Sequence, residues 1–289
     1  MKGRRRTERV RSLLLRIVGS ILALPFCALA DDRPPANASL DLGYRQMYRL
    51  DFDAALGVFA TWQRNNPDDP LGPASEAAGT LFSELNRLGI LEAQFFVEDD
   101  GFLGREKLRP SPDARARFDH ALGRADALAR RRIAVEPRDT DALFALTLVS
   151  GLQADYMSLI ENRNLAALGP TKRATEWAQK LLAVSPDYGD AYLATGLSKY
   201  LIGSSAAPVR WILTLGGFSA DKRRGIQELE WTAEKGRYLA PFARLLLAIA
   251  YLRENDHPRA VLMLEQLRDA FPENPLYARE IARIETGRS

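Results

Sequence analysis

One spacing occurs at both ends of this 289-residue chain and limits its fold more than any other feature. It runs from a small residue to an alanine, a large apolar residue and a proline, which follow after twelve, sixteen and twenty-four positions. The two sets are Gly43, Ala55, Phe59 and Pro67, and Ala248, Ala260, Leu264 and Pro272. A spacing repeated in this way predicts a fold assembled from copies of one supersecondary unit.

The unit has the pattern of two antiparallel helices joined by a turn. Its second helix carries apolar residues at helical spacing on one face: Ala260, Leu264, Leu267 and Phe271. The small residue of the first helix lets the second helix and its alanine approach closely. The proline ends the second helix because it lacks a backbone donor. Each pair leaves an apolar face that a neighbouring pair has to cover.

These residues resemble the tetratricopeptide repeat (TPR). The resemblance is carried by Leu42, Gly43, Ala55, Phe59 and Pro67 in the first unit, and by Leu247, Ala248, Tyr251, Ala260, Leu264 and Pro272 in the last. It implies a degenerate, exported bacterial TPR-like protein. Its first helices would form a concave groove for an extended segment or a helix of a protein partner.

The middle of the chain indicates three further units. A compact residue stands ten positions after each of three prolines, at Ala77, Thr147 and Gly196. We therefore expect an all-α fold, an α-solenoid of about five TPR-like helical hairpins plus a C-terminal capping helix over 275–286. The hairpins are predicted near 39–67, 73–137, 139–186, 189–237 and 239–272.

The three middle hairpins are longer than the standard repeat, and the surplus predicts inserts near 89–110, 155–170 and 203–218. Ser111 and Ser219 are expected to cap the helices that follow two of these inserts. The insert near 89–110 mixes aromatic and acidic residues. Its acidic run lacks the ligand spacing of a calcium loop, so we interpret the insert as packing against the solenoid.

The insert at 203–218 carries Arg210, Trp211, Leu213 and Phe218, which are candidate contacts with a partner or parts of a lid. Large apolar side chains are worth about 1.5–3 kcal/mol each when buried, so these require a cover. We expect the stretch VRWILTL to form a short helix across the chain's own groove. A docking site for a protein partner or for a membrane surface is the alternative.

The insert at 155–170 contributes the candidate polar groups of the groove, which are Tyr156, Glu161, Asn162 and Arg163. If these side chains face inward, they could recognise a ligand in the groove. The interpretation we favour is a hydrogen-bonded support for the lengthened helices.

The first thirty residues have the pattern of a secretory signal peptide: a basic start, an apolar stretch and a small-residue site that predicts cleavage near Ala30. Residues 31–38 are read as a flexible tether. We expect a periplasmic or secreted protein. A membrane anchor, through the uncleaved segment or an acylated Cys27, is the weaker interpretation. The segment has seven basic residues and one acid, so its removal lowers the formal charge from +3 to −3.

The inventory of reactive side chains is thin. The chain has two histidines, His120 and His257, and its one cysteine falls in the signal segment. It lacks a phosphate-binding glycine loop and a nucleophile elbow. We therefore predict no enzyme, no cofactor, and no catalytic or metal-ligating residue. The acidic mature charge and export argue against nucleic-acid binding.

The sequence thus predicts a non-enzymatic scaffold or adaptor of the bacterial cell envelope that binds a protein or peptide on its concave face. A structural subunit of an envelope complex would use the same fold. A carrier that encloses a small apolar ligand with its inserts is a further alternative. Peripheral membrane association stays open, and the sequence does not indicate an oligomeric state.

Overall fold

The structure is a computed structural model that describes residues 38–91 and 109–287. The expectations for the signal peptide and tether, and those for most of the insert near 89–110, lie outside the described residues. Residues from 37 to the C-terminus form one compact unit, and its described part contains helices and turns without strands.

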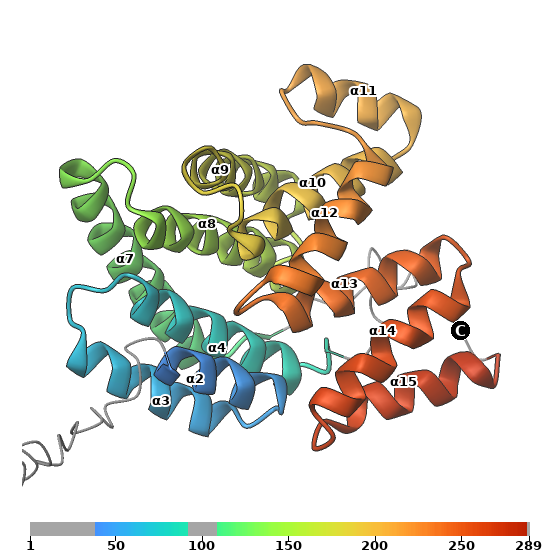
Figure 1. Cartoon of the computed structure of the whole chain (residues 1–289), viewed down its shortest axis with the longest axis horizontal. Helices are drawn as coiled ribbons and strands as arrows, with labels where there is room; N and C mark the ends of the chain where they lie inside the picture. The colour runs from blue at the N-terminus through green and yellow to red at the C-terminus, as the bar shows by residue number, and fades with distance from the viewer. Residues whose placement is uncertain (1–37, 92–108, 288–289) are drawn as a thin grey trace, which may run out of the picture. The chain divides into compact units, whose positions relative to one another are not determined.

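The described helices follow one another with short connections (Figure 1). Most of them belong to hairpins or cap them, and the others are one exposed helix and two short irregular turns. They are α2 (Ala38–Tyr48), α3 (Phe52–Asn65), α4 (Leu71–Arg87), α7 (Pro112–Val135), α8 (Thr140–Asp155), the π-helical turn η1 (Tyr156–Ile160), α9 (Asn164–Val184), the 3-10 turn η2 (Gly189–Ala191), α10 (Tyr192–Ser204), α11 (Ala207–Leu215), α12 (Lys222–Lys235), α13 (Ala240–Arg253), α14 (His257–Ala270) and α15 (Pro275–Glu285).

Five antiparallel pairs pack in chain order: α2 with α3, α4 with α7, α8 with α9, α10 with α12, and α13 with α14. Each pair also contacts the next, and α15 packs on α14 as the closing helix. The predicted fold class, an all-α stack of five TPR-like hairpins with a C-terminal helix, is confirmed.

A polar side chain caps the N-terminus of six of the described helices. Ser111 accepts a hydrogen bond from the backbone N–H of Ala114, with a proline in the first turn of α7, as the sequence predicts. The prediction for Ser219 is wrong, because Asp221 caps α12 by accepting from the N–H of Arg224. A carboxylate placed next to the first turn satisfies the same free N–H groups and also favours the helix dipole.

The crossing of the first hairpin shows why the small residues are spaced as they are. The ring of Phe59 is fully buried and lies between Gly43 of α2 and Gly79 of α4. A Cβ atom at Gly43 would overlap this ring, so the close approach of α2 and α3 requires glycine there. The partner at this site is Phe59 rather than the alanine that the sequence analysis expected, although Ala55 is also fully buried.

The central helix of the stack is α8, which contacts α4, α7 and α9. With neighbours on several sides it is apolar nearly all round, as a buried helix should be. The stretch Thr140–Ile160 is long and apolar enough to cross a membrane by composition, but 67% of it is buried inside the protein. Packing in the core therefore accounts for its composition.

The first hairpin also contacts the turn between α12 and α13, far away in the sequence. The hydroxyl of Tyr48 donates a hydrogen bond of 2.9 Å to the carbonyl of Tyr238. The guanidinium of Arg237 pairs with Asp41 at 2.6 Å, and the rings of Tyr44 and Tyr238 lie 4.9 Å apart. Part of the inner face between the two ends of the stack is therefore filled by aromatic side chains.

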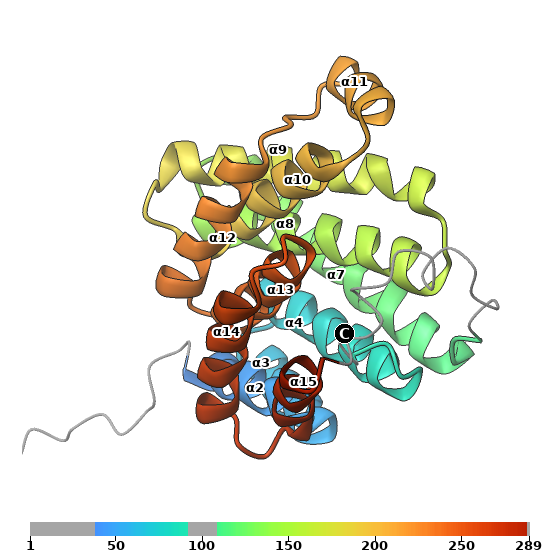
Figure 2. The ribbon, with the colours of Figure 1, turned by 90° about the vertical axis from the view of Figure 1, so that its right-hand side faces the viewer.

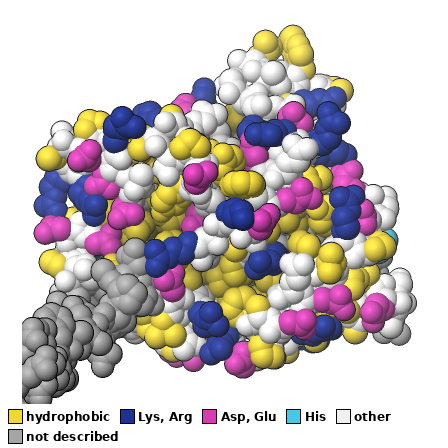
Figure 3. All heavy atoms as spheres, viewed as in Figure 1, with side chains coloured by type: hydrophobic (Ala, Val, Ile, Leu, Met, Phe, Trp, Pro, Cys, Tyr) yellow, Lys and Arg dark blue, Asp and Glu magenta, His cyan; other side chains and the backbone are white. Residues whose placement is uncertain are grey.

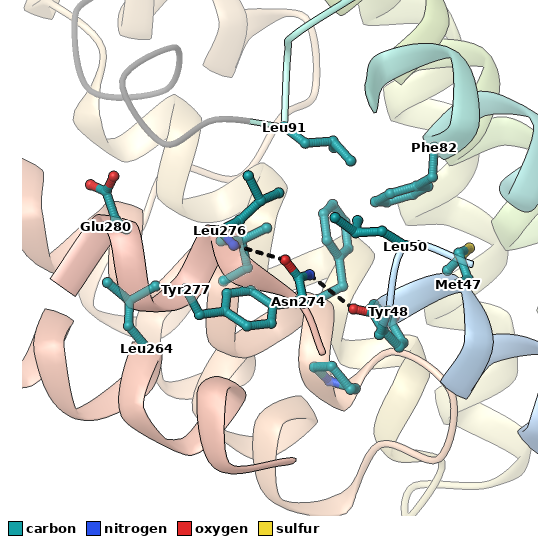
Figure 4. Close-up of a pocket in the computed structure, with 13 residues that line it drawn as sticks. Met47, Tyr48, Leu50, Phe82, Leu91, Leu264, Asn274, Leu276, Tyr277 and Glu280 are labelled. Atoms are coloured by element: carbon teal, nitrogen blue, oxygen red, sulfur yellow. Dashed lines mark hydrogen bonds between the residues drawn. The ribbon is translucent and has the colours of Figure 1, made fainter. Parts of the chain in front are cut away.

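The last turn of the stack reaches the first hairpin as well. The side-chain amide of Asn274 donates to the carbonyl of Tyr48 at 2.9 Å, while its oxygen accepts from the N–H of Leu276 (Figure 4). Around these bonds lies a pocket of about 40 Å³ whose walls include Phe82 and Tyr277. This pocket is too small for more than a water-sized group, so we read it as a packing gap.

Candidate functional site

A large cavity lies on the inner face formed by the first helices of successive hairpins. Its volume is about 420 Å³. Helices α4, α8, α10 and α13 provide most of its wall, and α9 and η1 complete it. These four are the first helices of successive hairpins in the stack.

The wall is mainly apolar. Its apolar side chains come from different hairpins: Phe82, Leu85, Leu148, Leu159, Leu193, Leu197, Leu239, Phe242, Leu245, Leu246 and Ile249. Small residues in α8, among them Gly151 and Ala154, lower the floor of the cavity. Cavities of about 300–1,000 Å³ with such walls are typical of binding sites for apolar groups.

Asp155 places a carboxyl group in this wall, at the last residue of α8. Within 38–91 and 109–287 it has no hydrogen-bond or ion-pair partner. Burial raises its pKa to about 7, because the charged form loses water without gaining a counter-charge. Near neutral pH the group is therefore able to donate a proton in a hydrogen bond or to accept one.

Asp190 also lines the cavity, but its carboxylate is already engaged. It accepts hydrogen bonds from the backbone N–H groups of Arg237, Tyr238 and Leu239, at 3.0, 3.1 and 2.8 Å. Burial raises its pKa, while these three donors act in the opposite direction. Asp190 therefore fixes the turn between α12 and α13 and holds α13 at the edge of the cavity.

The predicted polar groups of the groove lie elsewhere. Tyr156 is buried, and its ring stacks on that of Phe118 in α7 at 4.9 Å between centroids. The guanidinium of Arg115 sits 4.4 Å above the same ring. Tyr156 thus ties η1 to α7 and does not line the cavity.

Glu161, Asn162 and Arg163 form the turn between η1 and α9. Glu161 pairs with Arg115 of α7 at 2.5 Å and with Arg163 at 3.1 Å. Asn162 has a positive φ of 54°, which this residue type tolerates better than most. These contacts are of the supporting kind favoured above, and none of the three residues lines the cavity.

The other candidate contacts lie on or next to α11. The helix forms where the sequence analysis placed it, but it does not cover the groove, because Arg210, Trp211, Leu213 and Phe218 are all absent from the cavity wall. Trp211 is 66% exposed. Figures 1 and 2 both show α11 projecting beyond the hairpins.

Neither histidine approaches the cavity. His120 in the middle of α7 and His257 at the start of α14 are both exposed. In the part of the chain that the structure describes, no three His, Cys, Asp or Glu side chains gather as they would around a metal ion. The described wall of the cavity therefore contains neither a histidine nor a cluster of metal-ligating side chains.

Sequence reasoning missed the cavity and its carboxyl group. Two signals were present: α8 is apolar on every side, and Asp155 is the one charged residue between Asp141 and Glu161. An acid isolated in such a stretch marks a site at which the charge has to be explained. Asp155 lies in the wall of a cavity and has no counter-ion among the described residues. This placement depends on how α4, α10 and α13 pack together, which no local sequence pattern indicates.

No protein-family model matches the chain, and no curated protein matches its sequence. Among solved structures, a crystal structure of a thermophilic TPR protein from Thermus thermophilus is similar. The two are 18% identical, and the match covers 86% of this chain and 97% of that chain with a TM-score of 0.45. The assignment of the fold rests on the hairpins described above.

The described part of the chain is an all-α stack of helical hairpins with a closing helix. The inner cavity gives this stack a mainly apolar binding surface, whose charged residues are Asp155, Asp190 and Arg253.

Proposed function

We propose that the protein binds a protein partner of the cell envelope by taking an apolar segment of that partner into the inner cavity. The observation that carries the proposal is the cavity of about 420 Å³, walled by the first helices of four hairpins. Export to the envelope is supported by the signal-peptide pattern of the first thirty residues.

The chemistry of the wall defines the segment. Leu197 of α10, Leu246 of α13 and Leu148 of α8 present aliphatic side chains to one space, so a segment gains free energy by removing its own apolar side chains from water. The segment needs a hydrogen-bonding group near Asp155, because a buried polar group without a partner is costly. A helix or extended strand with a few large apolar side chains and one polar group satisfies both requirements.

Site-directed photo-crosslinking tests the proposal. A benzophenone amino acid at Leu246, in the cavity wall, should crosslink the full chain to a defined envelope protein. The same group at Leu262, which is 47% exposed on α14, should not. Peptide mapping of the crosslinked product should identify an apolar segment of the partner.

A cavity-filling substitution provides the second arm of the experiment. Leu197→Trp adds an indole to the wall, whereas Leu262→Trp adds one to the outer surface. The first should abolish partner crosslinking from a reporter placed at Leu148, and the second should leave it unchanged. Equal crosslinking by both variants would refute the cavity as the binding surface.

A carrier for a small apolar molecule is a second candidate, favoured by the cavity volume, which lies in the range of small-molecule sites. Native mass spectrometry of the freshly purified chain should then show an added mass that organic extraction removes. Leu197→Trp should prevent its retention. A bare mass before extraction would count against the carrier, and a co-purified protein segment would support the first proposal.

A further inference from the structure

α11 is built like a surface element without a protein neighbour. It is carried by the connection between α10 and α12, and its main contact with a described helix is with α10. No residue of α11 is buried. Four large apolar side chains on it are at least half exposed: Val209 at 50%, Trp211 at 66%, Ile212 at 63% and Leu215 at 70%.

The helix nevertheless separates apolar from polar side chains. At helical spacing, Trp211, Ile212 and Leu215 fall together on one side, and Arg210 and Thr214 fall on the other. The polar side turns back toward the chain, because the guanidinium of Arg210 donates to the carbonyl of Gly203 at 3.2 Å. The apolar side is thereby left facing solvent.

Specific contacts fix the two segments that connect α11 to α10 and α12. A Cβ atom at Gly203 would lie 2.5 Å from the backbone nitrogen of Lys222, so the two connections of α11 run close together at its base. The ammonium of Lys172 in α9 donates to the carbonyl of Gly216 at 3.0 Å. These contacts hold the apolar face of α11 away from the cavity. The segment is therefore a fixed helix and not a loop that closes over the cavity.

Cations surround the base of this projection. Residues 204–224 contain four basic residues and a single acid, Asp221. Lys222 pairs with Glu254, and Arg224 pairs with Glu228. Arg223 is exposed and has no ion-pair partner in the described chain. Figure 3 shows Lys and Arg side chains gathered below the projecting helix.

Two further cations at the base are engaged only by backbone carbonyls, which leaves their charge unneutralised. They are Lys172, bonded to Gly216, and Arg210, bonded to Gly203 and Ser205. Together with Arg223 they form a positively charged collar around an uncharged apolar tip. A protein partner of that tip would have to match both features, whereas an anionic lipid surface supplies both at once.

We propose that α11 docks this protein on an anionic lipid membrane, with Trp211, Ile212 and Leu215 entering the boundary between headgroups and acyl chains. The collar of Lys172, Arg210 and Arg223 then faces the phosphate groups. An indole ring is favoured at this depth because one edge is apolar and the other donates a hydrogen bond. The site is separate from the inner cavity, so it does not depend on the proposed partner.

Local fluorescence on vesicles tests the docking. In a full chain with Cys27→Ser, a cysteine introduced by Leu215→Cys is labelled with an environment-sensitive nitrobenzoxadiazole dye. The emission should rise and shift to the blue on phosphatidylglycerol vesicles. It should stay unchanged on phosphatidylcholine vesicles and with the same label placed by Leu262→Cys on α14. This readout is specific to α11, whatever the first thirty residues do on the membrane.

Partition measurements give the magnitudes. Trp211→Ser with Ile212→Ser should lower the local insertion constant on phosphatidylglycerol vesicles about a hundredfold, at about tenfold for each side chain. Trp231→Ser, which removes another exposed indole on α12, should leave the constant unchanged. Arg223→Ser should lower it about fivefold, and added salt should weaken it.

The outcomes separate the alternatives. A label on α11 that stays in a polar environment on anionic vesicles overturns the proposal, even if the chain binds them through another part. Equal insertion into neutral and anionic vesicles overturns the role of the cationic collar. A dye shift that appears without lipid and depends on protein concentration identifies α11 as a contact between copies of the chain, and also overturns membrane docking.

Discussion

Replacing Asp155 by asparagine should stabilise the protein, and the gain should depend on pH. The carboxyl lines the apolar cavity without a partner in the described ranges, and its pKa is raised from 3.8 to about 7 by burial. Asparagine has nearly the same shape and no charge. The substitution therefore removes the cost of ionising a partly buried acid and leaves the cavity wall in place.

The sign follows from proton linkage. The folded state holds the proton of Asp155 more tightly than the unfolded state does, so ionisation favours unfolding. The wild-type protein loses stability as pH rises from about 4 to about 7, and the loss stays constant above that. The difference between the two pKa values of Asp155, 3.8 and about 7, corresponds to a loss of about 4 kcal/mol in the free energy of unfolding. Water that enters the cavity would reduce this loss to between about 2 and 4 kcal/mol.

Urea unfolding followed by circular dichroism measures this difference. We expect the wild-type and Asp155→Asn proteins to have similar free energies of unfolding near pH 4, and the variant to be more stable by about 2–4 kcal/mol near pH 8. Asp187→Asn is the matched control, because this carboxylate is exposed in the turn after α9. It should change the free energy of unfolding by less than about 0.5 kcal/mol at either pH.

A variant that is equally or less stable than wild type near pH 8 would refute the reasoning. It would mean that Asp155 has a cationic or donating partner in the folded protein. A gain of the same size at both pH values would also refute it, because the stabilisation would then come from the amide and not from removal of a charge.

Three further perturbations probe the packing. Gly43→Ala should cost about 1–3 kcal/mol in urea unfolding because its Cβ would overlap the ring of Phe59, whereas Gly57→Ala, with open space around it, should be neutral or stabilising. Asp190→Ala should cost about 3 kcal/mol, since three backbone N–H groups of the α12–α13 turn lose their acceptor; a cost below about 1 kcal/mol would show that water replaces it. Glu84 bonds Arg87 and the N–H of Ser111, which lowers its pKa. Glu84→Gln should therefore be less stable than wild type at neutral pH. The difference should shrink as pH falls below the ordinary pKa of 4.5 and vanish only below the lowered pKa of the folded state; a difference that does not change with pH would contradict an electrostatic origin.

The repeat pattern predicted the stack because each of its signals is local. Gly43 and Phe59 lie in one hairpin, and Ser111 caps the helix that begins beside it. Such features depend on helical geometry and on a few neighbouring residues, so the residue types at fixed spacing carry the information. The prediction that Ser219 caps α12 was wrong for a related reason. Asp221, two residues later, has an equally good oxygen to accept a hydrogen bond from the first backbone N–H groups of the helix.

The candidate site could not be predicted in the same way. The cavity depends on the angles at which four hairpins meet, and α13 is set in place by Asp190 through a turn nearly fifty residues away. The position of α11 could not be predicted either, because none of its residues is buried against the hairpins. The sequence identified Trp211 as a side chain that needs a cover, but in the structure this side chain is 66% exposed.

The contacts that join the first hairpin to the far end of the stack alter how the molecule comes apart. An open array of repeats unravels unit by unit, because each repeat depends only on its neighbours. Here a second set of contacts joins units that are distant in the chain. They are the ion pair between Asp41 and Arg237 and the hydrogen bonds of Tyr48 with Tyr238 and Asn274. We therefore expect the outermost helices to fray less independently, and exchange of their amide protons with solvent to follow larger cooperative openings of the domain.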